Sequence, residues 1–308
     1  MKQFFKKILL FVPFCFALYL IGIVVWGEFI PSKYINNLRY KIGSIGQMQL
    51  RLQEAKRIKN VDILFIGSSA AYRGFDTRIF KKYGINSFNL GSSAQTPIQT
   101  LYLLRRYLME INPKLLVIDA NPLMLSIDGT ESALDIISND SFNKGMVDMA
   151  LSLNSLKVYH TLLYAWYASV FGEDKPPIDT VRNGDKYISG GFVEHELAFF
   201  KHINYEKQEW EYRKIQLRAF DKIIEYLKTI GVKYIIVQTP ITPKLYASFA
   251  NNSFIDSFLE KRGSYYNFNQ LITLNDSLHF LDANHLNQQG VEIYNNKLAE
   301  ILLKDNLF

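Results

Sequence analysis

The feature that most limits the fold of this chain is a short apolar run that ends in small polar residues. Residues 61–66 read VDILFI, almost wholly apolar and rich in β-forming side chains, and Gly67, Ser68 and Ser69 follow directly. Such a run is typical of a strand buried on both faces of a parallel sheet. Ligands bind at the carboxyl ends of strands in such sheets. The serines therefore belong either to a site or to an ordinary Gly-Ser-Ser turn.

Further apolar runs alternate with helical stretches along the chain. We expect four more strands, at Ser87–Leu90, Leu115–Ile118, Tyr234–Gln238 and His279–Leu281, separated by helices that include 97–110, 205–230 and 288–303. Strands that alternate with helices indicate an α/β fold with a doubly wound parallel sheet. We therefore predict a flavodoxin-like sheet of about five strands within residues 60–308.

The alternation is interrupted between residues 123 and 205. This segment contains helical, aromatic-rich stretches, with loop signals at Lys175-Pro176-Pro177 and Gly190-Gly191. We interpret it as a helical insertion that lies over the active edge of the sheet. Its aromatic side chains are interpreted as core, with a glycan-binding platform as the alternative.

The N-terminus carries a second strong signal. Residues 8–30 are apolar apart from Glu28 and follow three lysines. About 20 apolar residues span a bilayer, and flanking lysines favour a cytoplasmic N-terminus. A cleaved signal peptide is the alternative, but Val25-Trp26-Gly27 offers no Ala-x-Ala cleavage site. We predict a single-pass membrane anchor over residues 1–30, a stalk over 31–59, and a periplasmic or extracellular location for the remainder.

Charge and cysteine content exclude several classes of protein. The formal net charge is +6, without a Lys/Arg block typical of a nucleic-acid-binding arm. Cys15 is the single cysteine, so the chain can form neither an internal disulfide nor a cysteine-rich zinc site. His160, His195, His202 and His279 show no ligand spacing with carboxylates. We expect no nucleic-acid partner, no metal and no cofactor, and a structural role for these four histidines.

Small or polar residues follow the predicted strands and would converge on one edge of the sheet. Besides Ser68 and Ser69, they are Gly91, Asn121, Asp282 and His285. Asp282 and His285 are three residues apart, which on a helical turn places both on one face. A carboxylate there can hold the Nδ1–H of the imidazole and leave Nε2 to accept a serine proton. The alternative is a structural Asp–His pair that caps a helix.

The order of these residues resembles the SGNH hydrolases, also called the GDSL family. Gly67-Ser68-Ser69 matches the first block, Gly-Asp-Ser, with Ser69 at the nucleophile and Ser68 in place of the aspartate. Asn89-Leu90-Gly91 matches the second block. Asp119-Ala120-Asn121-Pro122 keeps only the asparagine of Gly-x-Asn-Asp, whereas Asp282-Ala283-Asn284-His285 matches Asp-x-x-His without change. The resemblance covers residues 60–122 and 205–300 approximately.

The resemblance implies a nucleophile at Ser69, a general base at His285 and an orienting carboxylate at Asp282. It also implies an oxyanion hole formed by the N–H groups of Ser69 and Gly91 and the amide of Asn121. Gly-Ser-Ser together with the N-terminal anchor resembles a membrane-tethered bacterial envelope branch, whose relatives act in O-acetylation of surface polysaccharides and D-alanylation of teichoic acids.

We therefore predict a serine esterase or O-acyltransferase that acts on acyl esters, chiefly acetyl esters, of cell-envelope polysaccharide. Its expected partners are an acylated glycan, the membrane and a membrane-bound acyl-donor protein. Two alternatives of other classes are a non-catalytic SGNH-fold module that binds a glycan or acyl chain, and a structural subunit of an envelope polysaccharide assembly. Turnover of an acetyl ester that depends on Ser69 would separate the enzyme from both.

Overall fold

The main sheet of the molecule is parallel throughout. The computed structural model describes residues 1–34, 38, 46–172, 179–201 and 203–307. The sheet has the strand order β2-β1-β3-β7-β8. Its strands are β1 (Ile63–Ile66), β2 (Ser87–Asn89), β3 (Leu115–Asp119), β7 (Tyr234–Gln238) and β8 (Tyr265–Asn267). Numbered within the sheet, this order is that of the flavodoxin-like doubly wound folds. The predicted fold class is confirmed.

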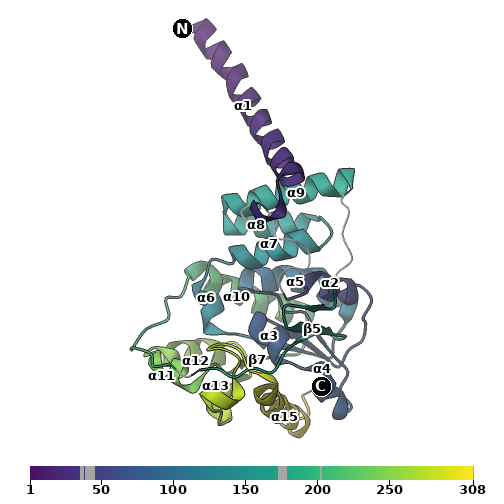
Figure 1. Ribbon diagram of the computed structural model, residues 1–308, viewed down its shortest axis with the longest axis vertical. Helices are drawn as coiled ribbons and strands as arrows, with labels where there is room; N and C mark the ends of the chain where they lie inside the picture. The colour runs from purple at the N-terminus through teal and green to yellow at the C-terminus, as the bar shows by residue number, and fades with distance from the viewer. Residues whose placement is uncertain (35–37, 39–45, 173–178, 202, 308) are drawn as a thin grey trace.

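Helices cover both faces of this sheet (Figure 1). In β1, Leu64 and Ile66 face one core cluster, whereas Ile63 and Phe65 face the other. The alternation explains the continuous apolar run, because a strand with two covered faces needs apolar side chains at every position. The first cluster is closed mainly by α2 (Met48–Ala55), α5 (Pro97–Ile111) and α10 (Lys214–Ile230), and the second by α3 (Ser69–Gly74), α4 (Thr77–Lys82) and α15 (Gln288–Lys304).

The fifth strand differs from the prediction. Residues His279–Leu281 were expected to form it, but Tyr265–Asn267 pairs with β7 instead. His279 ends the short helix α14 (Asp276–His279), and Phe280 makes only an isolated antiparallel bridge with Leu286. Phe280 is buried in the second core cluster, so its apolar character reflects burial of a loop. The other helices of this half are α11 (Pro243–Ser248), α12 (Asn252–Glu260) and α13 (Phe268–Leu271).

The predicted stalk, residues 31–59, contains part of the folded domain. Residues 35–37 and 39–45 lie outside the described residues. A short 3₁₀ helix, η1, spans Ser32–Tyr34. Helix α2 buries Met48, Leu52 and Ala55 in the first core cluster. The spacing of these three residues, four and three apart, places them on one face of the helix, and burial of that face joins α2 to the domain.

The insertion contains both helices and a second sheet. Its helices are α6 (Pro122–Ser126), α7 (Thr130–Asn139), α8 (Lys144–Leu153) and α9 (Leu156–Phe171), followed by the antiparallel strands β4 (Val181–Arg182), β5 (Asp185–Ile188) and β6 (Phe192–His195). A purely helical insertion was therefore wrong for its second half. Helices α7 and α8 pack on α2 and α5, and β6 packs on α3. The helical half thus stacks on one helical layer of the domain instead of covering the sheet edge.

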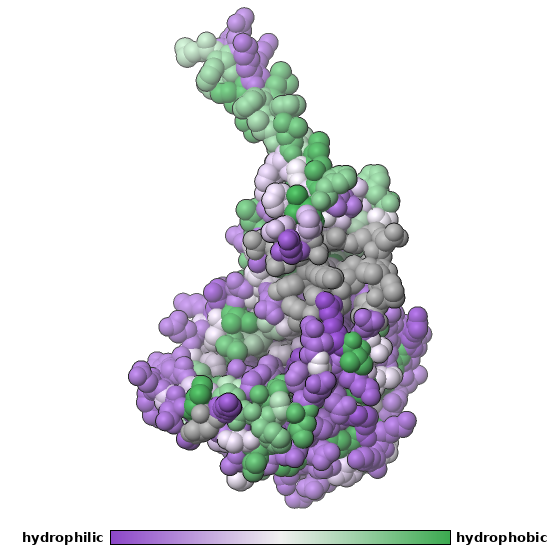
Figure 2. Space-filling view, viewed as in Figure 1, coloured by the Kyte–Doolittle hydropathy of each residue, from purple (hydrophilic) through white to green (hydrophobic). Residues whose placement is uncertain are grey.

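Helix α1 (Lys2–Phe29) extends from the helical end of the domain as a separate rod (Figure 1). Its surface is hydrophobic along most of its length and hydrophilic at the tip that carries the N-terminus (Figure 2). By length and composition this helix could cross a membrane. Pro13 lies inside it, which a membrane helix tolerates.

Candidate active site

Three predicted site residues meet at the carboxyl edge of the sheet. His285 Nε2 lies 2.8 Å from Ser69 Oγ, and His285 Nδ1 lies 2.8 Å from Asp282 Oδ2 and 3.0 Å from Asp282 Oδ1. The residues come from segments more than 200 positions apart in the sequence. A hydroxyl, an imidazole and a carboxylate in this sequence of hydrogen bonds form the arrangement that activates a serine as a nucleophile.

The local sequence fixes the position of Ser69. Ser68 is the N-cap of α3, and its buried hydroxyl accepts a hydrogen bond from the Ala70 N–H at 3.3 Å. Ser69 is the first residue of α3, and its own N–H has no hydrogen-bond partner in the described part of the chain. Such free N–H groups are a general property of helix N-termini. A cap at one serine therefore leaves the next, which is half-buried, with its hydroxyl on His285 Nε2 and an available N–H donor.

A turn fixes Asp282 and His285. Asp282 Oδ1 accepts the backbone N–H groups of Asn284 and His285 at 2.8 and 2.9 Å. The N-cap of the following helix α15 is Asn287, so Asp282 does not cap a helix. Burial acts to raise the pKa of Asp282, but the hydrogen bonds from His285 and from these two N–H groups outweigh it and lower the pKa below its ordinary value. The Asp282 side chain stays 49% exposed and that of His285 22%, so solvent reaches the pair.

The three expected oxyanion donors differ in availability. Asn121 is the N-cap of α6, where its Oδ1 accepts the Leu123 N–H at 3.0 Å, while its Nδ2 has no hydrogen-bond partner among the described residues. The Gly91 N–H, by contrast, donates to Asn89 Oδ1 at 3.1 Å. The asparagine side chain folds back onto the backbone two residues later, a common local motif. This contradicts the expectation of a free Gly91 donor and leaves Ser69 and Asn121.

Gly91 nevertheless packs against the turn formed by residues 67–69. A Cβ atom at this position would stand 3.0 Å from the carbonyl oxygens of Gly67 and Ser68, so a side chain would push the two strand ends apart. Arg51, fully buried in α2, donates to the Gly91 carbonyl and to the Gly191 carbonyl, each at 2.9 Å. An arginine from the predicted stalk thus holds the loop beside Ser69 in place.

A second carboxylate, that of Asp119, lies next to the turn formed by residues 67–69. Asp119, the last residue of β3, is buried, and its Oδ1 accepts the Thr239 N–H at 3.2 Å. Its Oδ2 has no hydrogen-bond partner within the described residues. Asp119 Cβ lies so near Gly67 that a Cβ atom added there would approach to 2.7 Å, which explains the glycine. Burial raises the pKa of Asp119 to about 6, and the hydrogen bonds to Thr239 offset only part of this effect.

We expect Asp119→Asn to change how stability depends on pH. Asp119 has a pKa of about 6 in the folded chain, against about 3.9 when unfolded. Between these values the folded state binds more protons, so the stability of the parent falls as pH rises from about 4 to 6. The difference in unfolding free energy between variant and parent should shift in favour of the variant by on the order of 2 to 3 kcal/mol over this window. Urea unfolding at pH 4, 5, 6 and 7 measures it; a difference that stays constant with pH would contradict the assignment.

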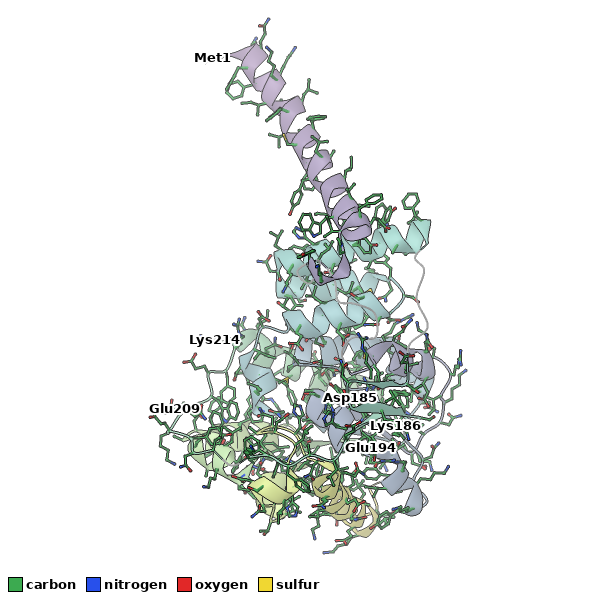
Figure 3. The ribbon with its side chains drawn as sticks, viewed as in Figure 1. Met1, Asp185, Lys186, Glu194, Glu209 and Lys214 are labelled. Atoms are coloured by element: carbon green, nitrogen blue, oxygen red, sulfur yellow. The ribbon has the colours of Figure 1, made fainter. Side chains whose placement is uncertain are left out.

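A second histidine–carboxylate pair, His195 and Asp185, contacts Arg73, which lies one helical turn after Ser69 in α3. Arg73 of α3 binds Asp185 of β5 through two hydrogen bonds of 2.8 and 2.7 Å, and His195 Nδ1 lies 2.7 Å from Asp185 Oδ1. Figure 3 shows Asp185 on the small sheet together with Lys186 and Glu194. His195 and Leu286, the neighbour of His285, line one small pocket.

That pocket borders a larger one, and His195, Glu196 and Gln288 line both. This cavity has a volume of about 430 Å³ and lies between the small sheet and α15. Its polar lining includes Lys186, Glu194, His195, Glu196, Gln288 and Glu292. Sequence reasoning assigned His195 a structural role and missed this cluster. Asp185 and His195 face each other across a hairpin, a pairing that depends on strand register.

Among the described residues, no group of three or more His, Cys, Asp or Glu side chains gathers in a way that could hold a metal ion.

Comparisons with known proteins give distant likenesses. No family model and no curated protein matches the sequence. The similar solved structures include two that are each 12% identical. One, from Bacteroides fragilis and described as an acylhydrolase, has a TM-score of 0.43 and covers 84% of this chain and 97% of its own. The other, a GDSL-like lipase from Bacteroides thetaiotaomicron, has a TM-score of 0.42 and covers 84% and 98%. Both are too distant to assign an activity, so the case for one rests on the side chains of this chain.

Proposed function

We propose that this chain is a membrane-anchored SGNH-type serine hydrolase or O-acyltransferase. The observation that carries the proposal is the 2.8 Å contact between His285 Nε2 and Ser69 Oγ, with Asp282 on the opposite ring nitrogen. A histidine held by a carboxylate and directed at a serine hydroxyl at a helix N-terminus is the geometry of acyl transfer through a covalent intermediate. An Asp–His pair that only caps a helix or supports the fold does not require a serine hydroxyl at the Nε2 atom of the imidazole.

The proposed reaction proceeds in two steps. Ser69 Oγ attacks the ester carbonyl carbon while His285 Nε2 takes the hydroxyl proton, and Asp282 stabilises the resulting imidazolium. The Ser69 N–H and Asn121 Nδ2 stabilise the oxyanion of the tetrahedral intermediate. His285 then returns the proton to the departing alcohol oxygen, leaving an acyl-serine. Water or a sugar hydroxyl, deprotonated by His285, attacks the acyl group and restores Ser69.

The proposed substrate is an acyl ester, chiefly an acetyl ester, of cell-envelope polysaccharide. Polar side chains in the lining of the cavity of about 430 Å³, among them Lys186, His195 and Gln288, support a substrate that carries hydroxyl groups, since ammonium, imidazole and amide groups suit hydroxyl partners. A membrane-bound acyl-donor protein is the proposed partner if the acyl group passes to sugar instead of water.

Labelling with a fluorophosphonate probe tests the proposal. The full-length chain in detergent should be labelled at Ser69, as mapped by peptide mass spectrometry, and should release acetate from an acetylated oligosaccharide. An unlabelled chain without turnover would instead favour a binding module or a structural subunit.

Asn121 allows a separate test of the oxyanion hole. Asn121→Asp keeps an oxygen for the Leu123 N–H but removes the Nδ2 donor, so we expect kcat for an acetyl ester to fall by about 10²- to 10³-fold. Asn121→Ala, which also removes the helix cap, should in addition cost about 1 kcal/mol of stability. A parental kcat in Asn121→Asp would show that this amide has no part in the reaction.

We further propose that α1 is an uncleaved membrane anchor with its N-terminus in the cytoplasm and the domain on the outer side. The chain should remain in the membrane after alkaline washing, and a C-terminal tag should be digested by protease added from outside. Recovery of a soluble product beginning near Gly27 would identify α1 as a signal peptide instead.

A further inference from the structure

Helix α9 has an apolar outer face that the protein leaves uncovered. Val158, Thr161 and Tyr164 are buried on its inner side. Trp166 is 47% exposed, Val170 57% and Phe171 69%. Lys157 is the only Lys, Arg, Asp or Glu in this helix of 16 residues. A helix on a water-exposed surface normally carries charged residues on its outer face. The composition of this face is instead that of a surface in contact with an apolar environment.

The same helix packs directly on α1. The Tyr164 hydroxyl donates to Glu28 Oε1 at 2.6 Å, and the Tyr164 ring fills the space where Gly27 would carry a side chain. Nearer the N-terminus of α1, Tyr19 is hydrogen-bonded to His160. Ile23 of α1 packs in a cluster against which Leu163 lies.

These contacts set the depth of α9 relative to a bilayer crossed by α1. The apolar run of α1 up to Gly27 is about 20 residues, or about 30 Å, the thickness of a hydrocarbon core. The contacts with α9 extend from Tyr19 to Glu28, about 14 Å along the helix axis. Helix α9 therefore lies beside the outer half of this apolar run, from within the hydrocarbon core at Tyr19 to the outer interface at Glu28.

The exposed residues of α9 suit that level. Figure 2 shows the hydrophobic surface of α1 continuing onto the adjoining end of α9. Tryptophan and tyrosine are enriched at membrane interfaces; α9 carries Trp166 and Tyr167, and α1 carries Trp26 near its C-terminal end. Aromatic and aliphatic side chains at the exposed positions of α9 suit the interfacial region beside a membrane-spanning helix.

We propose that α9 is embedded in the outer interface of the same bilayer that α1 crosses, with Trp166, Val170 and Phe171 in lipid. The partner of this face is a lipid surface, because the face is continuous with the membrane helix itself. The domain is then fixed on the membrane by two helices in contact instead of turning on a single flexible tether. This inference rests on the proposed anchor but not on the proposed chemistry.

Depth-dependent fluorescence quenching tests the proposal on the full-length chain in vesicles of phosphatidylcholine and phosphatidylglycerol. The chain has three tryptophans, Trp26, Trp166 and Trp210. Trp210 is buried in the domain and is kept in every variant. Trp26→Phe reports Trp166 plus Trp210, Trp166→Phe reports Trp26 plus Trp210, and the double variant gives the Trp210 background. Lipids brominated near the headgroup end or deep in the acyl chain serve as quenchers.

We expect brominated lipid to quench Trp166, after subtraction of the background, to at least half the extent of Trp26. Aqueous acrylamide should quench it weakly. Trp166 that is quenched by acrylamide and not by lipid would overturn the proposal, as would a Trp166 protected from both, which would indicate a second copy or another protein on this face. Retention after alkaline washing is measured on the same samples, so loss of the anchor is distinguished from a failure of α9 to enter the interface. Ester turnover of these variants reports separately on the proposed chemistry.

Discussion

Ser69→Ala is expected to lower kcat for an acetyl ester by on the order of 10⁵- to 10⁶-fold, the loss typical when a triad nucleophile is removed. The reason is geometric: Ser69 carries the hydroxyl that lies 2.8 Å from His285 Nε2. The variant should keep the fold, because the cap of α3 is made by Ser68 and is untouched. Acetate release, together with thermal unfolding of the same samples, measures both expectations.

Ser68→Ala is the matched control for this prediction. The neighbouring hydroxyl is buried and caps α3 through the Ala70 N–H, so its removal should cost about 1 kcal/mol of stability and leave most of kcat. The two variants should therefore show opposite patterns, one losing turnover and the other losing stability. Loss of turnover in Ser68→Ala with retention in Ser69→Ala would place the nucleophile one residue earlier and reject the proposed mechanism.

The strands with two buried faces were predictable because their sequences carry a strong local signal. β1, β3 and β7 are continuous apolar runs, and all three appear where they were expected. β8 gave no such signal, since Tyr265–Asn267 is short, partly polar and lies at the sheet edge. His279–Leu281 resembled a strand because Phe280 is apolar, but this residue is buried in a loop. Burial alone does not distinguish a strand from a loop that fills a gap in the core.

The small antiparallel sheet carried a signal that was not used. Asn183 and Gly184 both have positive φ, 51° and 78°, as the turn of a two-residue hairpin between β4 and β5 requires. Asn-Gly is the strongest short-range sign of such a hairpin. The pairing of Asp185 with His195 depends on the register of β5 and β6, and the contact of Arg73 with Asp185 depends on how this hairpin packs on α3. No local pattern contains that information.

The site was predictable as far as chain order and strand ends determine it. Ser69, Asp282 and His285 were expected at one edge of the sheet, and His285 lies within hydrogen-bonding distance of both Ser69 and Asp282. The occupied Gly91 N–H was not foreseen, since it depends on the rotamer of Asn89. Arg51 was not foreseen either, because a polar, glycine-interrupted segment gives no sign that one arginine in it is fully buried.

Asp282→Asn and His285→Ala should both lower kcat, but for different reasons and by different amounts. His285→Ala removes the base, so we expect a loss on the order of 10⁵- to 10⁶-fold, as for Ser69→Ala. Asp282→Asn keeps an oxygen for the Asn284 and His285 N–H groups but sets an amide N–H against His285 Nδ1. The imidazole then carries its proton on Nε2, toward Ser69, and cannot accept the serine proton, with an expected loss on the order of 10³- to 10⁴-fold.

The dependence of turnover on pH separates this orienting role from a merely structural one. The pKa of Asp282 is lowered by its hydrogen bonds from His285 and the turn N–H groups despite burial, so the carboxylate stays ionised below its ordinary pKa of about 4. Its contribution to stability is present above that pH and is lost only as pH falls through the lowered value. A fall in kcat/KM on acidification that begins well above this value therefore does not come from protonation of Asp282.

We therefore expect an acid limb in the parent and no such limb in the residual activity of His285→Ala, which keeps Asp119 and its effect on stability. A purely structural Asp282 gives another result: Asp282→Asn would lower the melting temperature and leave kcat at the parental value, because only the turn would be affected. Turnover of an acetyl ester and thermal unfolding, measured from pH 4 to 9 on the parent and both variants, decide between the two. Parental turnover in His285→Ala would reject the hydrolase mechanism itself, since no other side chain among the described residues is hydrogen-bonded to Ser69 Oγ.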